Sequence, residues 1–247
     1  MSKLRGKRAI VTGAGNGIGH SIAKAFLDNG ATVLAVDLSA EDLEARFAGV
    51  DNVSTLVADV ADDAAPSTIV SGAIEQLGGI DILVNNAGIV VAGQFETLTD
   101  EQFDTIMGVN VRAMFRISRE AITELQKCGR GRIINLGSIM SDLAGPALSI
   151  YGTSKHAVAG LTKGMAVDLG AYGITVNYLQ PGSIVTKMSE PFMDDPEFKK
   201  YWEDKAPIGR LGEADEVAEA ALFLASDEAQ FVSGVGLNVD GGAIVKF

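Results

Sequence analysis

The chain has 247 residues, with 20 lysines and arginines against 32 aspartates and glutamates, which gives a net charge of −12. This length permits one large domain with a substantial core, and no charge run or proline-rich stretch divides it, so we expect a single domain over residues 1–247. The acidic balance argues against an electrostatic surface for nucleic acid or an anionic membrane, which leaves small molecules and other subunits as the expected partners.

Short runs rich in β-branched residues alternate along the chain with longer segments of helical periodicity, a pattern typical of parallel βαβ units. We predict strands at residues 8–12, 32–36, 53–58, 81–85, 132–137, 174–179 and 236–239. We predict helices at about residues 18–29, 40–47, 63–77, 100–127, 150–170 and 214–225. These elements indicate an α/β fold with a doubly wound, about seven-stranded parallel sheet that carries helices on both faces.

The stretch at about 187–210, KMSEPFMDDPEFKKYWEDKAPIGR, interrupts this alternation. It holds three of the six prolines and the one tryptophan, and it shows no clear strand. An irregular insert between a late strand and the last helix is typical of a mobile cover over a substrate site. The alternative is a surface excursion whose aromatic side chains pack on the core.

The N-terminal sequence MSKLRGKRAIVTGAG contains only a short apolar run, so it lacks the long apolar region and cleavage site of a signal peptide. No segment approaches the run of at least about 18 apolar residues that a membrane span requires. The single cysteine, Cys128, can form no internal disulfide, and we therefore expect a cytoplasmic protein.

A glycine-rich loop, VTGAGNGIG at 11–19, joins the first predicted strand to the first predicted helix. Gly13, Gly17 and Gly19 allow a tight turn and let a diphosphate approach the backbone, where the N–H groups and dipole of a helix N-terminus favour negative charge. Glycine turns are common, so the loop alone is weak evidence. Its position between strand and helix is what indicates a nucleotide site.

Asp37 directly follows the second predicted strand, 24 residues after Gly13. A carboxylate here accepts hydrogen bonds from the adenosine ribose hydroxyls and repels a 2′-phosphate, which predicts NAD rather than NADP. The nearby Asn16 and Leu38 supply no cation for such a phosphate. The alternative role for Asp37 is a helix cap, although Ser39 is better placed for that role.

The sequence YGTSK at 151–155 places a phenol and an ammonium four residues apart, on one face of a predicted helix. A phenol has a pKa of about 10, and a nearby cation stabilises the phenolate, so Tyr151 and Lys155 form a plausible proton-transfer pair. The alternative is a partly buried tyrosine beside a lysine that extends into water.

Five motifs occur together along the chain: TGAGNGIG, NNAG at 85–88, GS at 137–138, YGTSK, and PGSIVT at 181–186. Their order and spacing resemble those of the short-chain dehydrogenases/reductases over essentially the whole chain. The resemblance implies a single-domain Rossmann-type enzyme that usually assembles as a homotetramer.

The resemblance also implies catalytic roles, with Tyr151 as the acid/base and Ser138 as its partner. Lys155 would bind the nicotinamide ribose and lower the pKa of the tyrosine, and Asn110 would hold a water that links Lys155 to solvent. These roles suit alcohol oxidation, in which a base takes the hydroxyl proton as hydride leaves carbon. By itself, Ser138 would indicate only a turn and Asn110 only a buried polar group.

Further cofactor contacts follow from the same resemblance. Around the glycine-rich loop and the second strand they are Gly13, Asn16, Gly17, Ile18, Gly19, Asp37 and Leu38. After the third and fourth strands they are Asp59, Val60, Asn85, Asn86, Ala87 and Gly88. Around the nicotinamide they are Tyr151, Lys155, Pro181, Gly182, Ile184 and Thr186.

Three positions depart from the common pattern of the family. Thr153 stands where alanine is frequent, Gly137 stands where many members have a second serine, and Gln180 precedes the proline-glycine pair. Gly137 and Gln180 would border the pocket and affect specificity. Since His20 and His156 stand alone in the sequence, no histidine or cysteine cluster suggests a metal.

These observations predict an NAD-dependent oxidoreductase that acts on an uncharged secondary alcohol or its ketone. The expected lid is rich in apolar side chains, among them Met188, Tyr201 and Trp202, which suit an apolar or cyclic substrate, whereas its lysines are expected to be solvated. One alternative is a 3-oxoacyl-carrier-protein reductase. Against it, Tyr172 stands where such reductases resemble one another in having arginine, and two acidic proteins repel. The other alternative is a catalytically silent, NAD-sensing regulator.

Overall fold

The structure, a computed structural model, describes residues 2–187, 189–190 and 195–246. Seven strands form one parallel sheet in the order β3-β2-β1-β4-β5-β6-β9. Their bounds are β1 Arg8–Thr12, β2 Thr32–Asp37, β3 Val53–Val57, β4 Ile82–Asn85, β5 Arg132–Leu136, β6 Thr175–Pro181 and β9 Gly236–Val239. The seven-stranded parallel sheet predicted from the sequence is therefore confirmed.

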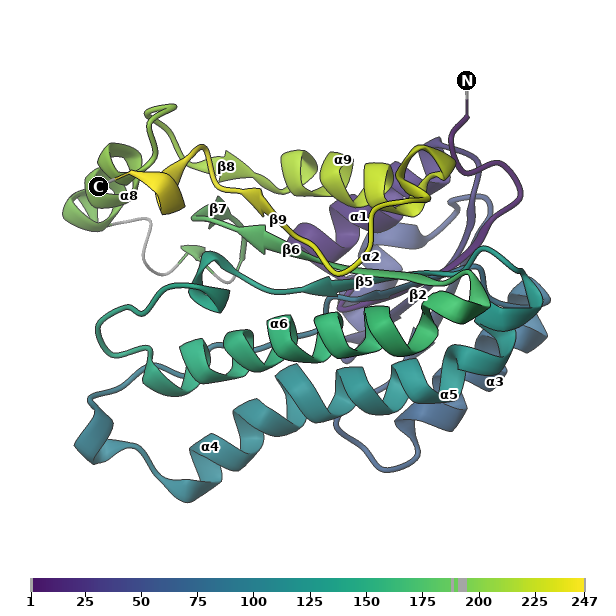
Figure 1. The fold of residues 1–247 in the computed structure, drawn as a ribbon, viewed down its shortest axis with the longest axis horizontal. Coiled ribbons are helices and arrows are strands. Elements are labelled where there is room, and N and C mark those ends of the chain that lie inside the picture. Colours follow the sequence, from purple (N-terminus) through teal and green to yellow (C-terminus); the bar gives the residue numbers. More distant parts are fainter. Residues whose placement is uncertain (1, 188, 191–194, 247) are drawn as a thin grey trace.

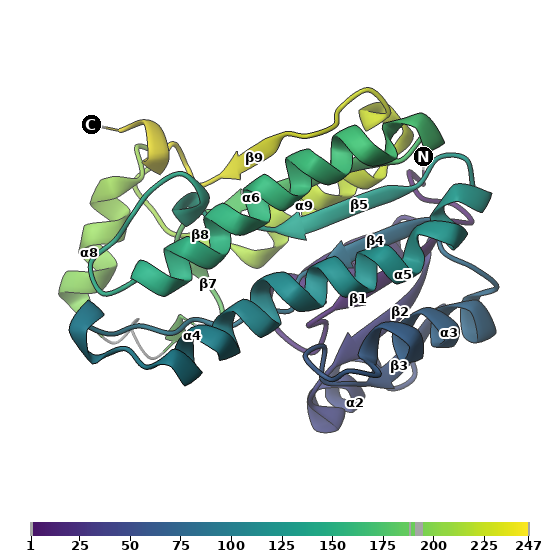
Figure 2. The ribbon, with the colours of Figure 1, turned by 60° about the horizontal axis from the view of Figure 1, so that its bottom comes forward.

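Helices cover both faces of this sheet, as Figures 1 and 2 show. Their bounds are α1 Gly17–Asp28, α2 Ala40–Phe47, α3 Ala65–Leu77, α4 Asp100–Met107, α5 Met114–Lys127, α6 Ser149–Leu169, α8 Pro196–Lys205 and α9 Ala214–Ala225. One core joins the sheet to α1, α2 and α9, and a second core joins its other face to α3, α5 and the end of α6. The doubly wound arrangement is thus confirmed. None of the helices in the described part of the chain has the length and apolar character needed to cross a bilayer.

Side chains of the central strands alternate between the two cores. In β1, Ala9 and Val11 belong to the core shared with α1 and α9, whereas Ile10 belongs to the core shared with α3 and α5. Because both faces are buried, such strands are continuously apolar in sequence. A shift of one residue would exchange the two sets of side chains, so this packing fixes the register of the sheet.

Local sequence signals set several helix ends. Ser39 caps α2, since its hydroxyl accepts a hydrogen bond from the Asp42 amide at 3.1 Å, as expected. Thr99 and Gln102 form a capping box at the start of α4, and Gly78 ends α3 in the left-handed conformation. These signals set where α2 and α4 begin and where α3 ends, and thus where the loops start.

The carboxyl ends of the strands lie at the same edge of the molecule as α8 and the C-terminal residues (Figure 1). The strand order reverses at β1, because β2 and β3 lie on one side of it and β4 and the later strands lie on the other. In open α/β sheets a crevice forms outside the carboxyl ends at such a reversal, and ligands bind in it. The topology therefore positions a site here.

The helix predicted over 100–127 is divided. α4 ends at Met107, residues Gly108–Ala113 form a π-helical segment, and α5 begins at Met114. Asn110 lies in this wider turn with its side chain almost completely buried. The apolar periodicity on either side remains helical, so the sequence pattern gave no sign of the interruption.

The segment predicted to be irregular contains regular structure. It includes α8. Just outside it, the short strand β7, Ile184–Val185, pairs in parallel with β8, Gly212–Glu213, which brings the two ends of the segment together. Asp195 caps α8 by accepting a hydrogen bond from the Glu197 amide at 2.9 Å, and Pro196 suits the first helical position because an amide hydrogen there needs no helical partner. A proline taken as a sign of irregular chain thus marks a helix start. Met188 lies outside the described residues.

Candidate active site

A cavity of about 470 Å³ opens at the carboxyl edge of the sheet, among the loops that follow β1, β4, β5 and β6. The predicted site residues that line it are Gly13, Asn16, Gly17, Ile18, Asp37, Asn86, Ala87, Gly88, Ser138, Tyr151, Lys155, Pro181, Gly182, Ile184 and Thr186. The fold therefore brings the expected nucleotide end and the expected catalytic end into one hollow.

The glycine-rich loop is packed too closely to accept side chains. Gly13 has φ +66°, in the left-handed region, and a β-carbon at Gly19 would collide with the Gly13 carbonyl oxygen. Asn86 holds the loop, because its Nδ2 donates to the Thr12 carbonyl at 2.9 Å and to the Gly13 carbonyl at 3.0 Å. Bare backbone and the N-terminus of α1 thus form a cradle suited to a diphosphate, so the residues present fit a dinucleotide.

Asp37 lies in the wall of the same cavity, and the backbone orients its carboxylate. Oδ2 accepts a hydrogen bond from the Gly15 amide at 2.8 Å, and Oδ1 accepts one from the Ser39 amide at 3.0 Å. Each carboxylate oxygen retains a further lone pair, so the group can still accept hydrogen bonds from ribose hydroxyls.

Tyr151 and Ser138 interact at the other end of the cavity. Ser138 follows β5, and Tyr151 lies in the first turn of α6. Burial, the larger effect, raises the pKa of Tyr151, and its hydrogen bond with Ser138 lowers that pKa by less. The chain's own groups therefore keep the phenol neutral near pH 7, in the form that donates a proton.

Lys155 lies one turn further along α6 and is only 6% exposed. Its Nζ donates to the Leu136 carbonyl at 2.8 Å and lies 5.7 Å from the centre of the Tyr151 ring. Burial lowers the pKa of Lys155 to about 8, because the ammonium loses hydration. The expected lowering of the tyrosine pKa by Lys155 is not found among the chain's own groups, since desolvation dominates at both residues.

Asn110 lies behind the cavity wall and does not line the cavity. Its Oδ1 accepts from the Ile89 amide at 2.8 Å, and its Nδ2 donates to the Ile89 carbonyl at 2.9 Å and to Ser154 Oγ at 3.1 Å. Ser154 in turn donates to the Tyr151 carbonyl at 2.7 Å. Asn110 therefore ties the wall at Ile89 to the helix that carries Tyr151 and Lys155.

Other predicted contact residues also lie outside the cavity lining: Gly19, Leu38, Asp59, Val60 and Asn85. Asn85 departs most from expectation, because its Nδ2 donates to Ser118 Oγ at 3.0 Å and to Asn135 Oδ1 at 2.9 Å, in a network buried inside the fold. Gly19 supports the glycine-rich loop from behind, and Leu38 is 69% exposed. Asp59 and Val60 follow β3, the strand beside that of Asp37.

Gly137, which was expected to border the pocket, lines the cavity. The lining residues that were not predicted are Ile89, Val90, Leu136, Ser183, Lys187 and Ser189. Each lies within three residues of a residue already singled out, so proximity to the motifs is the signal that would have found them. The most informative is Lys187, which the sequence grouped with the solvated lysines of the lid.

The structure explains the departure at Gly137 and changes the view of Gln180. A β-carbon at Gly137 would lie 2.9 Å from both the Leu179 carbonyl oxygen and the Tyr178 ring, so packing behind the cavity requires glycine. Gln180 is buried outside the cavity lining, where its Nε2 donates to Asp142 Oδ2 at 2.6 Å. It therefore braces the turn after Ser138 and does not border the pocket.

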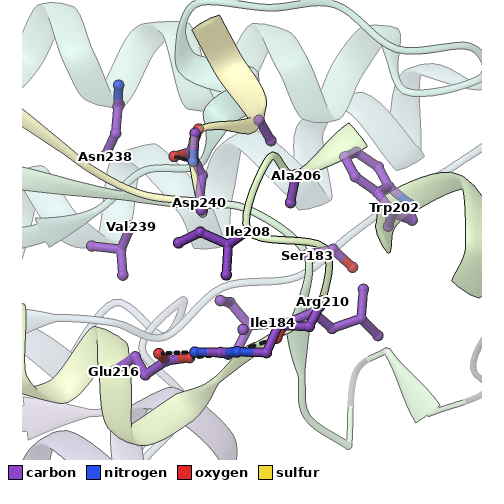
Figure 3. Close-up of a pocket in the computed structure, with 15 residues that line it drawn as sticks. Ser183, Ile184, Trp202, Ala206, Ile208, Arg210, Glu216, Asn238, Val239 and Asp240 are labelled. Atoms are coloured by element: carbon purple, nitrogen blue, oxygen red, sulfur yellow. Dashed lines mark hydrogen bonds and ion pairs between the residues drawn. The ribbon is translucent and has the colours of Figure 1, made fainter. Parts of the chain in front are cut away.

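A second cavity, of about 300 Å³, lies between α8, the loop at 206–212 and the end of β9 (Figure 3). Its charged side chains already have partners. Arg210 donates to both carboxylate oxygens of Glu216, at 2.7 and 2.8 Å, and holds the pKa of Glu216 at about 2. Asp240 accepts from the amides of Gly242 and Ile244. Within the described residues no group of His, Cys, Asp and Glu suits a metal ion. The residues predicted to carry the chemistry, Ser138, Tyr151 and Lys155, line the first cavity.

Comparison with known proteins agrees with this geometry. A family model described as enoyl-(acyl carrier protein) reductase matches residues 13–243. Gluconate 5-dehydrogenase of Gluconobacter oxydans is 39% identical over 250 residues, which cover 100% of this chain and 98% of that protein. The 2-(R)-hydroxypropyl-CoM dehydrogenase of Xanthobacter autotrophicus is 44% identical over 241 residues, which cover 94% and 96% of the two chains.

Among solved structures, a gluconate 5-dehydrogenase from Burkholderia cenocepacia in complex with NADP and tartrate matches with a TM-score of 0.93 at 35% identity. The match covers 100% of this chain and 99% of that one. The similarity in sequence and in fold thus extends over nearly the whole length of the chain.

Proposed function

The chain belongs to the short-chain dehydrogenase/reductase family, and we propose that it transfers hydride between NAD(H) and a secondary alcohol or its ketone. One observation carries the proposal: Tyr151, Ser138 and Lys155 line the same cavity as the glycine-rich loop and Asp37. A nucleotide cradle and a proton-transfer pair in one hollow suit a reaction that couples hydride transfer to proton transfer.

The residues have distinct roles in this reaction. When bound, the nicotinamide supplies the hydride acceptor or donor. Tyr151 takes the hydroxyl proton during oxidation and returns it during reduction, and Ser138 donates a hydrogen bond to the substrate oxygen as its negative charge develops. Lys155 uses one of its three N–H donors on the Leu136 carbonyl, which leaves two for a ribose hydroxyl.

We propose that the substrate is uncharged and that the segment at 187–210 covers it. Ile89, Val90 and Leu136 give the cavity apolar lining, and the hydroxyls of Ser183 and Ser189 give it a few polar groups. A hydroxy acid is the second candidate, because two similar proteins are named for gluconate and a cation, Lys187, lines the cavity.

A screen of NADH formation with secondary alcohols, polyols, hydroxysteroids, hydroxy acids and hydroxyacyl thioesters tests the proposal. We expect uncharged secondary alcohols to give the highest kcat/KM. Turnover of hydroxy acids alone would favour the second candidate, and turnover of thioesters alone would instead indicate a carrier-linked reductase. Binding of NADH without turnover of any of these alcohols would favour a silent NAD-sensing regulator.

We expect a preference for NAD(H) that depends on the charge of Asp37. In Asp37→Asn the size of the side chain is kept but the repulsion of a 2′-phosphate is lost, so the ratio of kcat/KM for NAD over NADP should fall by about 10- to 100-fold. Steady-state kinetics with both cofactors measures this ratio. A wild-type preference for NADP, as bound in the Burkholderia structure, would contradict the assignment.

We also expect a homotetramer. Exposed apolar side chains occur on α4, α5, α6 and near β9, and they include Phe103, Phe115, Val167 and Phe231. Light scattering at micromolar concentration should give four times the chain mass. Because Val167 is 82% exposed in the single chain, Val167→Glu should leave the fold intact. The buried charge should weaken the contact between subunits and reduce the mass of the assembly. A wild-type monomer would contradict this prediction.

A further inference from the structure

Lys187 differs from the other described lysines of the lid. Lys199 and Lys200 form exposed pairs along α8 with Glu203 and Asp204. Lys187 instead follows Thr186 directly and lines the main cavity. Its position is therefore that of a binding-site residue.

The base of the lid lies directly against the glycine-rich loop. A β-carbon placed at Gly17 would lie 3.3 Å from Thr186 Cβ and Cγ2, so the side chain of Thr186, the residue before Lys187, packs on the start of α1. Asp42, on α2, packs on the same loop, since a β-carbon at Gly15 would lie 2.9 Å from Asp42 Cβ. The Nζ of Lys187 lies 3.5 Å from Asp42 Oδ2. A cation thus lies at the diphosphate cradle, held there by an aspartate 145 positions away in sequence.

The cradle otherwise lacks a full positive charge. The N-terminus of α1 contributes about half a charge, whereas a diphosphate carries about two negative charges. Among the described residues that line the cavity, the charged ones are Asp37, Lys155 and Lys187. Lys155 is committed to the Leu136 carbonyl at the catalytic end, which leaves Lys187 for the diphosphate.

We propose that Lys187 binds the diphosphate of the dinucleotide. In the free protein Asp42 pairs with this lysine, and on binding the diphosphate replaces Asp42 as its partner. The inference rests on the proposed use of a dinucleotide and adds a residue to that site. The Lys187–Asp42 pair is long, and the lysine side chain is 66% exposed, so the pair is weak enough to exchange. A diphosphate offers more negative charge than one carboxylate and forms charge-assisted hydrogen bonds with an ammonium.

The exchange also links cofactor binding to the lid. Lys187 is the second residue after β7 and begins the segment that leads to α8. Binding of its ammonium to the diphosphate fixes the first residue of the lid against the cradle.

Titration calorimetry with ADP and with adenosine separates the diphosphate from the rest of the nucleotide. Lys187→Met should raise the Kd for ADP by about five- to tenfold and leave the Kd for adenosine unchanged, and Lys187→Arg should retain most of the affinity for ADP. Added salt should weaken ADP binding less in Lys187→Met than in the wild type. Unchanged ADP affinity in Lys187→Met, or an equal loss for adenosine, would overturn the proposal.

A double-mutant cycle tests the exchange itself. Asp42→Asn should lower the Kd for ADP by about two- to threefold in the wild type and have no effect in Lys187→Met. If Asp42→Asn also raised the affinity for ADP in the Lys187→Met background, the cause would be a general charge effect, and the proposed exchange would be wrong.

Arg46 provides a matched control, because its Nη2 lies 3.5 Å from Asn16 Oδ1 but the residue does not line the cavity. Arg46→Ala should change ADP binding by less than about twofold. A larger loss in Arg46→Ala than in Lys187→Met would assign the diphosphate to Arg46.

The failure of this inference can be told apart from a failure of the proposed function. If the wild type bound neither ADP nor NADH, the proposed function itself would fail. If Lys187→Met bound ADP as tightly as the wild type, only the role of Lys187 would be wrong.

Discussion

Replacement of Tyr151 by phenylalanine is expected to lower kcat by about 10²- to 10⁴-fold and to leave the Kd for NADH within about twofold of wild type. The substitution removes one hydroxyl, so the ring still packs at the start of α6 while the proton transfer is lost. Single-turnover kinetics and fluorescence titration with NADH measure the two quantities. Near-wild-type turnover in Tyr151→Phe would refute the assignment of the acid/base.

Tyr172→Phe is the matched control, because this tyrosine is half exposed and lies beyond the end of α6, outside the cavity lining. It should leave both kcat and Kd unchanged. The raised pKa of Tyr151 adds a dependence on pH. Oxidation needs the phenolate and should accelerate as pH rises, whereas reduction uses the neutral phenol and should not accelerate.

Lys155→Met is expected to abolish most turnover and, at pH 7, to increase the free energy of unfolding by about 2 kcal/mol. The lowering of the lysine pKa from 10.5 to about 8 corresponds to a cost of about 3 kcal/mol for the buried charge. Loss of the hydrogen bond to the Leu136 carbonyl offsets about 1 kcal/mol of the gain. A residue that suits catalysis thus lowers stability.

The pH dependence of stability identifies the buried charge as the cause. Below pH 8 both the folded and the unfolded chain carry the proton on Lys155, so the full cost is present. Between pH 8 and 10.5 the unfolded chain keeps a proton that the folded chain has lost, so the wild type gains stability as pH rises and its difference from Lys155→Met shrinks.

Urea unfolding at fixed protein concentration, at pH 7 and pH 9.5, measures this difference. Lys163→Met is the control, because Lys163 is an exposed lysine of the same helix. A destabilised Lys155→Met at pH 7, or a difference that does not change with pH, would contradict the explanation.

The sequence by itself determined the parallel sheet, the helices on its two faces and the identity of most residues that line the cavity. The physical reason is that these features follow from local patterns. Strands buried on both faces are continuously apolar, and helix ends carry caps such as Ser39. The tight turn at Gly13 excludes side chains, which makes the glycine-rich loop recognisable in the sequence.

Only the tertiary structure decided which polar residues reach the cavity. Asn85 and Asn86 are neighbours in sequence, yet opposite side-chain directions at the end of β4 bury Asn85 in a network with Ser118 and Asn135 and leave Asn86 on the glycine-rich loop. In the same way, the π-helical turn buries Asn110 behind the wall at Ile89. Such outcomes depend on contacts between distant segments, which no local pattern encodes.

The tertiary structure also decided the electrostatics. The spacing of Tyr151 and Lys155 predicted a phenol with a lowered pKa, but burial raises the pKa of that phenol and lowers the pKa of the lysine, because desolvation depends on everything packed around a group. Lys187 is solvated, as its neighbours in sequence indicate, but the fold also gives it a partner that the sequence does not predict. Its place beside Asp42 and the glycine-rich loop arises because the side chain of Thr186 packs on the start of α1, a contact between segments far apart in the chain.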